Sequence, residues 1–417
     1  MPQVAFRLKP AGTRRPLKLY SVAKATNSAC FYYRCFTPWK TAEEMGLLKY
    51  RIDDYEKMDV DARTEALSES EIHAYYLILD KNLIKRIRFF RGLHDTWSKK
   101  KNRKVYAPRI VFDSDDDLER VDPYNPKFAT LGSHSPDGQL LNPGDRIVAE
   151  AGEGGEHLPL WVDGKIYGEG QRFDIKRNRK AFELYRATAR MASGCTVTCE
   201  TLATIFRGYG AHNVYVYPNS IRFQDYPKID LVHDPKVVKI LWQGGWSHYR
   251  DWYPLQDAIR RVSEKYPQAR FLIWGQHYRW IHSAIPPTRR DFLNWVPHDA
   301  YIIRLSTIGH DINLAPLADT RFNRSKSAIK WYESSALHRP AATLAQRNGP
   351  YGDEIQDRQT GLLFDTPEEF ETKLGELIED ATFRQELASN AKQWVWENRR
   401  AEVTTPGLID WYWSLLE

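Results

Sequence analysis

Three charged side chains are predicted to lie on one face of a helix. Lys326, Lys330 and Glu333 are spaced by four and three residues, and an α-helix brings residues at these spacings to the same side. The helix is predicted from about Ser327 to Leu337. Such a set lies where a nucleotide diphosphate could bind, because phosphate oxygens accept strong hydrogen bonds from cationic side chains. On a solvated helix the same residues would form only an ion pair.

The segment before this helix places the three residues at the edge of a sheet. Ile312, Leu314 and Ala315 predict a short buried strand, and a polar turn over 319–325 leads from it into the helix. Ligands of open α/β sheets bind at the carboxyl ends of the strands, where exposed N–H groups at helix starts favour phosphate. The sequence therefore predicts an anion site at this edge.

A second glycine-containing turn has the same relation to strand and helix. Strands are predicted at 237–242 and 270–274 with a helix at 253–266 between them, the order of a doubly wound unit. Gly244 and Gly245 fall in the first turn, where the lack of a side chain lets backbone N–H groups approach an anion. The alternative is a surface turn that binds nothing.

The region 236–400 resembles the nucleotide-binding half of GT-B glycosyltransferases, most closely the retaining family 4 enzymes. Five features of that family occur here in order, and a sixth is altered. Glu333 matches the second glutamate of the Glu-x7-Glu motif, Arg339-Pro340 the helix exit, Gly349 and Glu354 the next turn, and Thr360–Leu363 the closing strand. Ser325 stands at the first glutamate, so its donor-sugar contact is expected to pass to Lys326 or Asp319.

The resemblance implies an α/β protein of GT-B architecture, with two doubly wound Rossmann-like domains facing across a cleft. It also implies a nucleotide-sugar donor, most simply a UDP-sugar, retention at the anomeric carbon, and no required metal or cofactor. Arg250 takes the position of the family's phosphate-binding lysine, and His248 would supply the donor that the family's arginine provides. The predicted donor-binding residues are Gly244, Gly245, Arg250, Ser325, Lys326, Lys330, Glu333 and Tyr351.

The length of 417 residues predicts more than one domain, because a single core stops growing at about 250–300 residues. We expect an acceptor-side domain at 1–233, a nucleotide-sugar domain at 234–400, and a C-terminal helix at 401–417 packing back on the first domain. Strands are predicted at 17–22, 105–113, 195–198 and 214–217, and a helix at 68–93.

Glycine-rich residues 131–175 are predicted to form an insertion that either shapes acceptor specificity or is a surface loop, with a hairpin at 158–167 around Asp163-Gly164.

The sequence contains no membrane-spanning run or signal segment, and the spacing of its four cysteines favours free thiols over zinc. A cytoplasmic protein, in a host cytoplasm if it is viral, is the expectation.

The acidic run at 113–117 follows a predicted strand and has three interpretations. Asp113 and Asp115 could hold a divalent metal, as in GT-A glycosyltransferases. The run could instead cap a helix that starts near Leu118. In a GT-B enzyme, Asp115 or Asp116 could hold a sugar hydroxyl or accept the acceptor's proton. We predict Asp115, Asp116 and His248 as the catalytic residues, with no metal ligand.

Positive charge is concentrated in one segment of a chain whose net charge is +6. Eleven Lys or Arg residues and one acid, Asp95, lie between Lys81 and Arg109. Five of these basic residues are predicted to contact an acceptor polyanion, namely Lys99, Lys100, Lys101, Arg103 and Lys104. Hydroxymethylated pyrimidine in DNA, as in bacteriophage-type DNA modification, is the first expectation. Alternatives are a polysaccharide or lipid-linked glycan at an anionic membrane, an inactive nucleic-acid-binding protein, or a solvated helix face.

Overall fold

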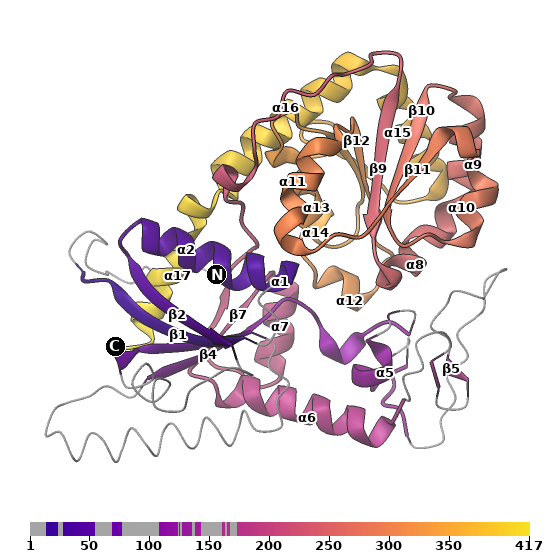
Figure 1. The fold of residues 1–417 in the computed structure, drawn as a ribbon. Coiled ribbons are helices and arrows are strands. Elements are labelled where there is room, and N and C mark those ends of the chain that lie inside the picture. The colour runs from indigo at the N-terminus through magenta and orange to yellow at the C-terminus, as the bar shows by residue number, and fades with distance from the viewer. Residues whose placement is uncertain are drawn as a thin grey trace, which may run out of the picture. The chain divides into compact units, whose positions relative to one another are not determined.

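Two compact units, each containing one six-stranded parallel sheet, make up the chain in the computed structural model (Figure 1). The structure describes residues 14–23, 28–54, 69–76, 108–123, 125, 127–135, 138–142, 161–162, 165–166 and 173–417. The first unit comprises Met1–Asp115, Leu184–Arg222 and Asn398–Glu417, and the second comprises Asp116–Glu183 and Phe223–Glu397. The predicted α/β class is confirmed.

The sheet of the first unit has the strand order β2-β1-β3-β4-β7-β8, and all of its pairings are parallel. Its strands are β1 (Leu17–Ala23), β2 (Leu48–Asp54), β3 (Ile72–Tyr76), β4 (Arg109–Ser114), β7 (Gly194–Val197) and β8 (Val214–Val216). The helices are α1 (Ala29–Phe31), the π-helix η2 (Tyr32–Phe36), α2 (Thr37–Glu44), α7 (Glu200–Gly208) and α17 (Ala401–Ser414), while α6 (Ile175–Met191) runs through both units.

The helix predicted over 68–93 is wrong in its first part, because Ile72–Tyr76 forms the inner strand β3. Four successive residues from Ile72 to Tyr75 are buried, so both faces of this strand are covered. A strand covered on both faces has no alternation of polar and apolar residues, and periodicity cannot distinguish it from a buried helix. Residues 77–93 lie outside the described part of the chain. The edge strand β2 was not predicted.

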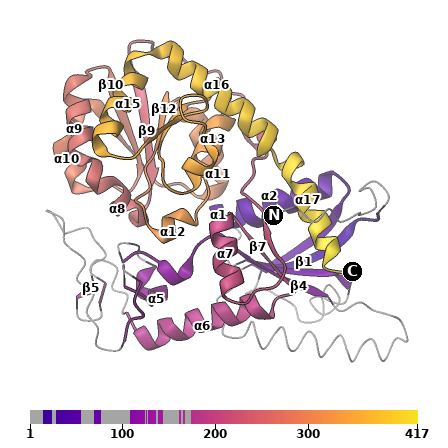
Figure 2. The same cartoon turned by 180° about the vertical axis from the view of Figure 1, so that it is seen from behind.

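The core of the first unit joins its sheet to two helices that are far apart in sequence. Leu17 and Leu19 of β1 cluster with Trp39 of α2 and with Leu408 and Tyr412 of α17. Helix α17 lies beside α2 in both views (Figure 1, Figure 2). The indole N–H of Trp39 donates to the Tyr412 hydroxyl at 3.4 Å, so the helix packing includes a polar contact.

A buried ion pair lies at the carboxyl ends of strands in the first unit. Arg34 of η2 donates through Nε and Nη2 to the two carboxylate oxygens of Asp113, at 3.0 and 2.7 Å. The Thr196 hydroxyl donates to the same carboxylate at 2.5 Å, and Arg34 also donates to the Tyr217 carbonyl and, at 3.2 Å, to Asn219. The guanidinium nitrogens of Arg34 and the carboxylate oxygens of Asp113 therefore all have hydrogen-bond partners within the protein. Buried charged groups need such partners because burial removes them from water.

The sheet of the second unit has the order β11-β10-β9-β12-β13-β14 and is also wholly parallel. Its strands are β9 (Val238–Gly244), β10 (Ala269–Gly275), β11 (Arg290–Leu293), β12 (Ile312–Ala315), β13 (Ala342–Gln346) and β14 (Leu362–Phe364). This is the doubly wound order, in which the direction of strand addition reverses between β9 and β12. The predicted strands at 237–242, 270–274 and 312–315 are confirmed.

Helices of the second unit cover both faces of this sheet (Figure 1). They are η6 (Trp246–His248), α8 (Tyr249–Trp252), η7 (Tyr253–Leu255), α9 (Gln256–Lys265), α10 (Arg279–Ala284), η8 (Pro287–Arg289), α11 (His298–Ile308), α12 (Arg321–Arg324), α13 (Ile329–Ala336), α14 (Pro350–Glu354), α15 (Pro367–Glu379) and α16 (Ala381–Asn398). The unit also contains η3 (Leu118–Arg120), α5 (Phe128–Leu131), η5 (Phe223–Asp225) and the predicted hairpin, β5 (Trp161–Val162) with β6 (Lys165–Ile166).

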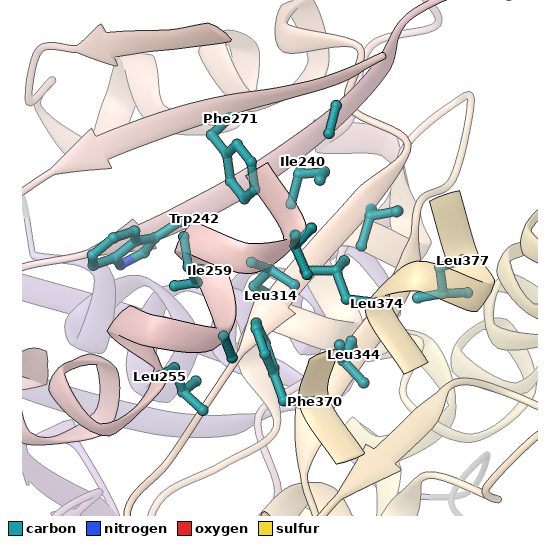
Figure 3. Close-up of a cluster of buried hydrophobic side chains, with 14 of the residues drawn as sticks. Ile240, Trp242, Leu255, Ile259, Phe271, Leu314, Leu344, Phe370, Leu374 and Leu377 are labelled. Carbon is teal, nitrogen blue, oxygen red and sulfur yellow. The ribbon is translucent and has the colours of Figure 1, made fainter. Parts of the chain in front are cut away.

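The core of the second unit joins alternate residues of the strands to helices α9, α10 and α15. Figure 3 shows strand side chains such as Ile240 and Leu314 together with Ile259 of α9 and Phe370 of α15. Ile240 and Trp242 of β9 point to the same side as Leu314 of β12, as the two-residue strand period dictates. Trp242 stacks on Trp252 at 3.8 Å between ring centroids and on Trp280 at 5.4 Å. Because Trp252 belongs to α8, its stacking on Trp242 joins this helix to the end of β9.

None of the helices in the described residues is long and apolar enough to cross a membrane. All four cysteines are free, and Cys35 and Cys195 are buried.

Replacing Arg34 with Met is expected to lower the free energy of unfolding by about 3–5 kcal/mol, because Asp113 would stay buried with an uncompensated charge. Urea unfolding followed by circular dichroism measures the loss. The double variant Arg34→Met with Asp113→Leu should lose less than the single variant, since neither charge remains buried. A double variant less stable than the single one would contradict this account.

Candidate functional site

The reversal of strand order in the second unit defines where its ligand site is expected. Strands β9 and β12 are adjacent at the centre of the sheet, and the chain continues from their carboxyl ends to helices α8 and α12. Open α/β sheets bind ligands outside the carboxyl ends of the strands, at the point where the strand order reverses. The first segment begins at Gln243 and the second at Pro316, and the predicted donor-binding residues Gly244, Gly245 and Ser325 lie in these segments.

Glycines allow the backbone at this edge to come unusually close. Gly275 ends β10 with φ +108°, and a Cβ at that position would lie 2.5 Å from the Gly244 carbonyl oxygen. Gly275 and Gly244 are paired in register, so only glycine fits at the end of β10. A Cβ on Gly245 would meet nothing within 4 Å, so this position is open on its side-chain face.

One buried carboxylate connects the two segments. Asp251 is 4% exposed and accepts from His248 Nδ1 at 2.7 Å, from the backbone N–H of Ala318 at 2.8 Å and from Asn323 Nδ2 at 2.8 Å. Asn323 also donates to the Ala318 carbonyl at 2.9 Å. The turn after β9 and the segment after β12 are therefore held together by hydrogen bonds at a single side chain.

His248 is a neutral imidazole near pH 7. Burial, together with the positive charge of Lys330, lowers the pKa of His248 to about 4. Burial acts to raise the pKa of Asp251, but the hydrogen bond from His248 and the charge of Lys326 hold it below its usual value. The carboxylate only accepts, so Nδ1 carries the proton and Nε2 is an acceptor. His248 would donate to a phosphate only after taking up a second proton.

Two lysines bring positive charge to the same place. Lys330 donates from Nζ to the Gln243 carbonyl at 2.9 Å, and burial lowers its pKa to about 8 although Asp251 opposes the shift. Lys326 lies near enough to lower the pKa values of Lys330 and His248, with its Nζ 4.8 Å from the centroid of the Phe322 ring. Adjacent cations at a sheet edge are suited to bind a dianion.

Glu333 is buried on α13 beside these lysines. Its Oε2 lies 2.8 Å from the Tyr301 hydroxyl, which also contacts Gln243 Oε1 at 2.7 Å. Burial and the negative charge of Glu333 raise the pKa of Tyr301 well above its usual value, so this hydroxyl keeps its proton. Tyr351 of α14 is also buried, and its pKa is raised by burial and by Glu333 and Asp251.

The predicted residues are thus brought together in part. His248, Lys326, Lys330, Glu333 and Tyr351 form one electrostatically coupled cluster. Sequence reasoning missed four of its members, which are Gln243, Asp251, Tyr301 and Asn323. The spacing of three between His248 and Asp251 was the only local signal for them.

Three further residues of the predicted donor site are engaged in protein contacts. The buried Ser325 hydroxyl donates to the Phe322 carbonyl at 2.8 Å and closes the short helix α12. Arg250 donates to Asp122 at 2.8 Å with its side chain 43% exposed. Asp319 accepts two hydrogen bonds from Arg324, at 2.5 and 2.7 Å. Their donor-binding roles stay predictions.

The aspartates of the acidic run 113–117 make different contacts in the structure. Asp113 forms the buried pair with Arg34, and Asp117 caps η3 by accepting from the Glu119 N–H at 3.2 Å, so the capping interpretation is confirmed for Asp117. Asp115 accepts from the Tyr76 hydroxyl at 2.8 Å. The catalytic roles of Asp115 and Asp116 stay predictions. No group of three His, Cys, Asp or Glu side chains suited to a metal occurs in the described residues.

The basic residues Lys99, Lys100, Lys101, Arg103 and Lys104 lie outside the described residues. Their predicted contact with an acceptor therefore rests on the sequence alone.

No protein-family model and no curated protein matches this sequence. Solved structures do match its fold. A glycosyltransferase from Rickettsia africae has a TM-score of 0.58 at 11% identity, covering 97% of this chain and 100% of that one. Sucrose-phosphate synthase from Thermosynechococcus elongatus gives 0.56 at 10% identity, over 96% of this chain and 99% of that one.

Other structural neighbours have been solved with nucleotide bound. HepE from Anabaena, in complex with UDP and glucose, gives a TM-score of 0.55 at 12% identity, covering 95% of this chain and 100% of that one. TarM gives 0.51 at 10% identity, and the match covers 82% of this chain but only 54% of TarM. These likenesses confirm the predicted GT-B fold.

Lys330 is expected to destabilise the ligand-free protein. Its pKa of about 8 lies below the value of 10.5 for an unperturbed lysine, so protonation disfavours the folded state. The resulting loss in the free energy of unfolding is greatest below pH 8 and disappears as the pH rises toward 10.5. Lys330→Met should therefore unfold at a higher temperature than the wild type at pH 7, with a smaller difference at pH 10. Thermal unfolding at both pH values checks this, and a difference that grows with pH would contradict it.

Proposed function

We propose that this protein is a glycosyltransferase that uses a nucleotide sugar, most simply a UDP-sugar, as donor. The observation that carries the proposal is the cluster of Lys326, Lys330 and buried Glu333 at the strand-order reversal of a GT-B fold. Support comes from the HepE structures, which contain UDP, UDP with glucose, or UDP-glucose.

The cluster suits the charge changes of glycosyl transfer. Negative charge builds on the leaving diphosphate as the sugar departs, and fixed cations stabilise it in a site shielded from water. Lys326 and Lys330 supply that charge, and the open Gly245 backbone allows close approach of a phosphate. Glu333 accepts hydrogen bonds from ribose hydroxyls. The family 4 resemblance implies that the anomeric configuration is retained and that no metal is required.

For the acceptor, we propose the hydroxyl of a hydroxymethylated pyrimidine in DNA, with Asp115 or Asp116 accepting its proton. Support comes from the basic run 99–104, which suits sequence-independent contacts with phosphates. The same run would serve a polysaccharide or lipid-linked glycan at an anionic membrane, or an inactive protein that only binds nucleic acid.

One experiment tests donor and acceptor together. The protein is incubated with a panel of nucleotide sugars and with DNA containing hydroxymethylated pyrimidines, and the DNA is digested to nucleosides for mass spectrometry. A hexose or pentose mass added to the modified base supports the full proposal. If the donor is hydrolysed but the DNA stays unmodified, the protein is still a glycosyltransferase and its acceptor is a molecule other than DNA. Absence of both donor binding and turnover for every nucleotide sugar contradicts the proposed function.

Glu333→Ala is expected to weaken UDP binding by about 1.5–3 kcal/mol, because it removes a charge-assisted hydrogen bond to the ligand. Isothermal titration calorimetry measures the loss. Glu379→Ala is the matched control. Glu379 also accepts a hydrogen bond from a tyrosine, because the Tyr266 hydroxyl donates to it at 2.7 Å. Tyr266 lies just before the amino end of β10, away from the candidate site. A folded Glu333→Ala protein with wild-type affinity would remove Glu333 from the site.

Reversing Lys99, Lys100, Lys101 and Arg103 to Glu should weaken DNA binding and leave UDP binding unchanged. Each phosphate contact contributes about −0.9 to the slope of log K against log salt, so loss of four contacts should make the slope shallower by about 4. Fluorescence anisotropy over a salt series measures both quantities. Wild-type protein without salt-dependent DNA binding would contradict the DNA acceptor, and binding to anionic vesicles would then support the glycan acceptor.

A further inference from the structure

The imidazole ring of His248 is held in one orientation at the turn after β9. Its Nδ1 donates to Asp251 at 2.7 Å, and Asp251 is fixed in turn by the Ala318 N–H and by Asn323 Nδ2, both at 2.8 Å. Another edge of the ring packs on Gly244, where an added Cβ would lie only 2.9 Å from His248 Cδ2. Because the ring is held at two of its edges, Nε2, the atom bonded to Cδ2, points in a defined direction.

The Nε2 atom of His248 is a hydrogen-bond acceptor that no side chain or backbone group of the described residues satisfies. The ring stays neutral near pH 7, because burial and the charge of Lys330 lower its pKa to about 4. The side chain is 13% exposed, so the ring is not sealed inside the protein. Phosphate oxygens also only accept, so a phosphate cannot satisfy this atom and a hydroxyl group can.

The surroundings of His248 indicate which hydroxyl this is. Lys330 interacts electrostatically with Asp251, the partner of His248, and also with Glu333. The cluster therefore contains two groups that accept hydrogen bonds from hydroxyls, with a cation that interacts with both of their surroundings. A nucleotide sugar has the matching pattern, since its diphosphate joins the hydroxyls of the ribose to those of the sugar. In the proposed function Glu333 contacts the ribose, which leaves the sugar for His248.

We propose that His248 accepts a hydrogen bond from a hydroxyl of the transferred sugar through Nε2, and that Asp251 is the positioning residue that holds the ring for this contact. This role differs from the phosphate contact that the sequence suggests for His248. The nucleoside diphosphate left after transfer lacks the sugar, so the contact favours the substrate over the product. The inference rests on the proposed nucleotide-sugar function and adds recognition of the sugar to it.

His248→Asn separates the two nitrogen atoms of the ring. The amide nitrogen of Asn takes the place of Nδ1 and can still donate to Asp251, whereas the acceptor Nε2 is removed. The ligands are UDP and whichever of UDP-glucose, UDP-galactose and UDP-N-acetylglucosamine the wild type binds most tightly. Affinity for this UDP-sugar should fall about three- to tenfold, the effect of one hydrogen bond, and affinity for UDP should stay unchanged. Titration calorimetry measures both affinities, after thermal unfolding has shown that the variant folds.

Nitrogen-15 NMR of the wild type provides a second test that does not depend on folding of the variant. The spectrum should show the proton of the His248 ring on Nδ1. The Nε2 signal should move toward that of a hydrogen-bonded acceptor nitrogen when the UDP-sugar binds, and it should not do so when UDP binds. A change of equal size with both ligands would contradict the proposal.

His338→Asn is the matched control, because it alters a contact of 3.3 Å between a histidine and an aspartate, Asp230, in the segment between α13 and the amino end of β13. It should alter neither affinity. If His248→Asn loses affinity for UDP and the UDP-sugar to the same extent, or for neither, the sugar contact is overturned while wild-type binding preserves the proposed function. Wild-type protein that binds UDP but none of the UDP-sugars also overturns the sugar contact, and wild-type protein that binds none of these nucleotides overturns both.

Discussion

The buried carboxylate of Asp251 is the constraint on which the candidate site depends. It accepts three hydrogen bonds, from His248, from the Ala318 backbone and from Asn323, and so joins the turn after β9 to the segment after β12. Parallel strands fix only where these segments begin. The side chain of Asp251 adds the contacts that fix where the two segments run next. Hydrogen bonds to a buried charge are stronger than neutral ones, so this anchor holds both segments in one geometry before any ligand arrives.

The same region concentrates positive charge at a cost to the protein. A lysine with a pKa of about 8 and a histidine with a pKa of about 4 are both placed where their charged forms are disfavoured. A structure selected only for stability would not keep such groups together. A diphosphate would relieve the repulsion, raise both pKa values and draw protons to the site. On the proposed function, this unfavourable electrostatic energy would be recovered when the diphosphate of the donor binds, and a stability cost of this kind is typical of functional sites.

The sequence predicted the second unit better than the first, for a physical reason. Strands such as Ile312–Ala315 end at turns with glycine, proline or helix-capping residues, and these local signals have local causes. In the first unit, Ile72–Tyr76 is covered on both faces, and its apolar run carries no period that separates strand from helix. The residues of the candidate site also differ in whether a local sequence pattern could predict them. Lys330 and Glu333 share a helix and were predicted, whereas Tyr301 meets Gln243 across 58 residues and Glu333 across 32, which no local pattern encodes.

Ser325 occupies the position that the resemblance to family 4 enzymes assigns to a glutamate. Its side chain is fully buried, and its hydroxyl closes α12 on the Phe322 carbonyl. Thr320 caps the other end of that helix through the Asn323 N–H at 3.1 Å, and the Asn323 side chain reaches Asp251. The position has therefore become part of the scaffold that orients Asn323. Lys326, the next residue along the chain, is partly exposed, in contrast to the buried Ser325.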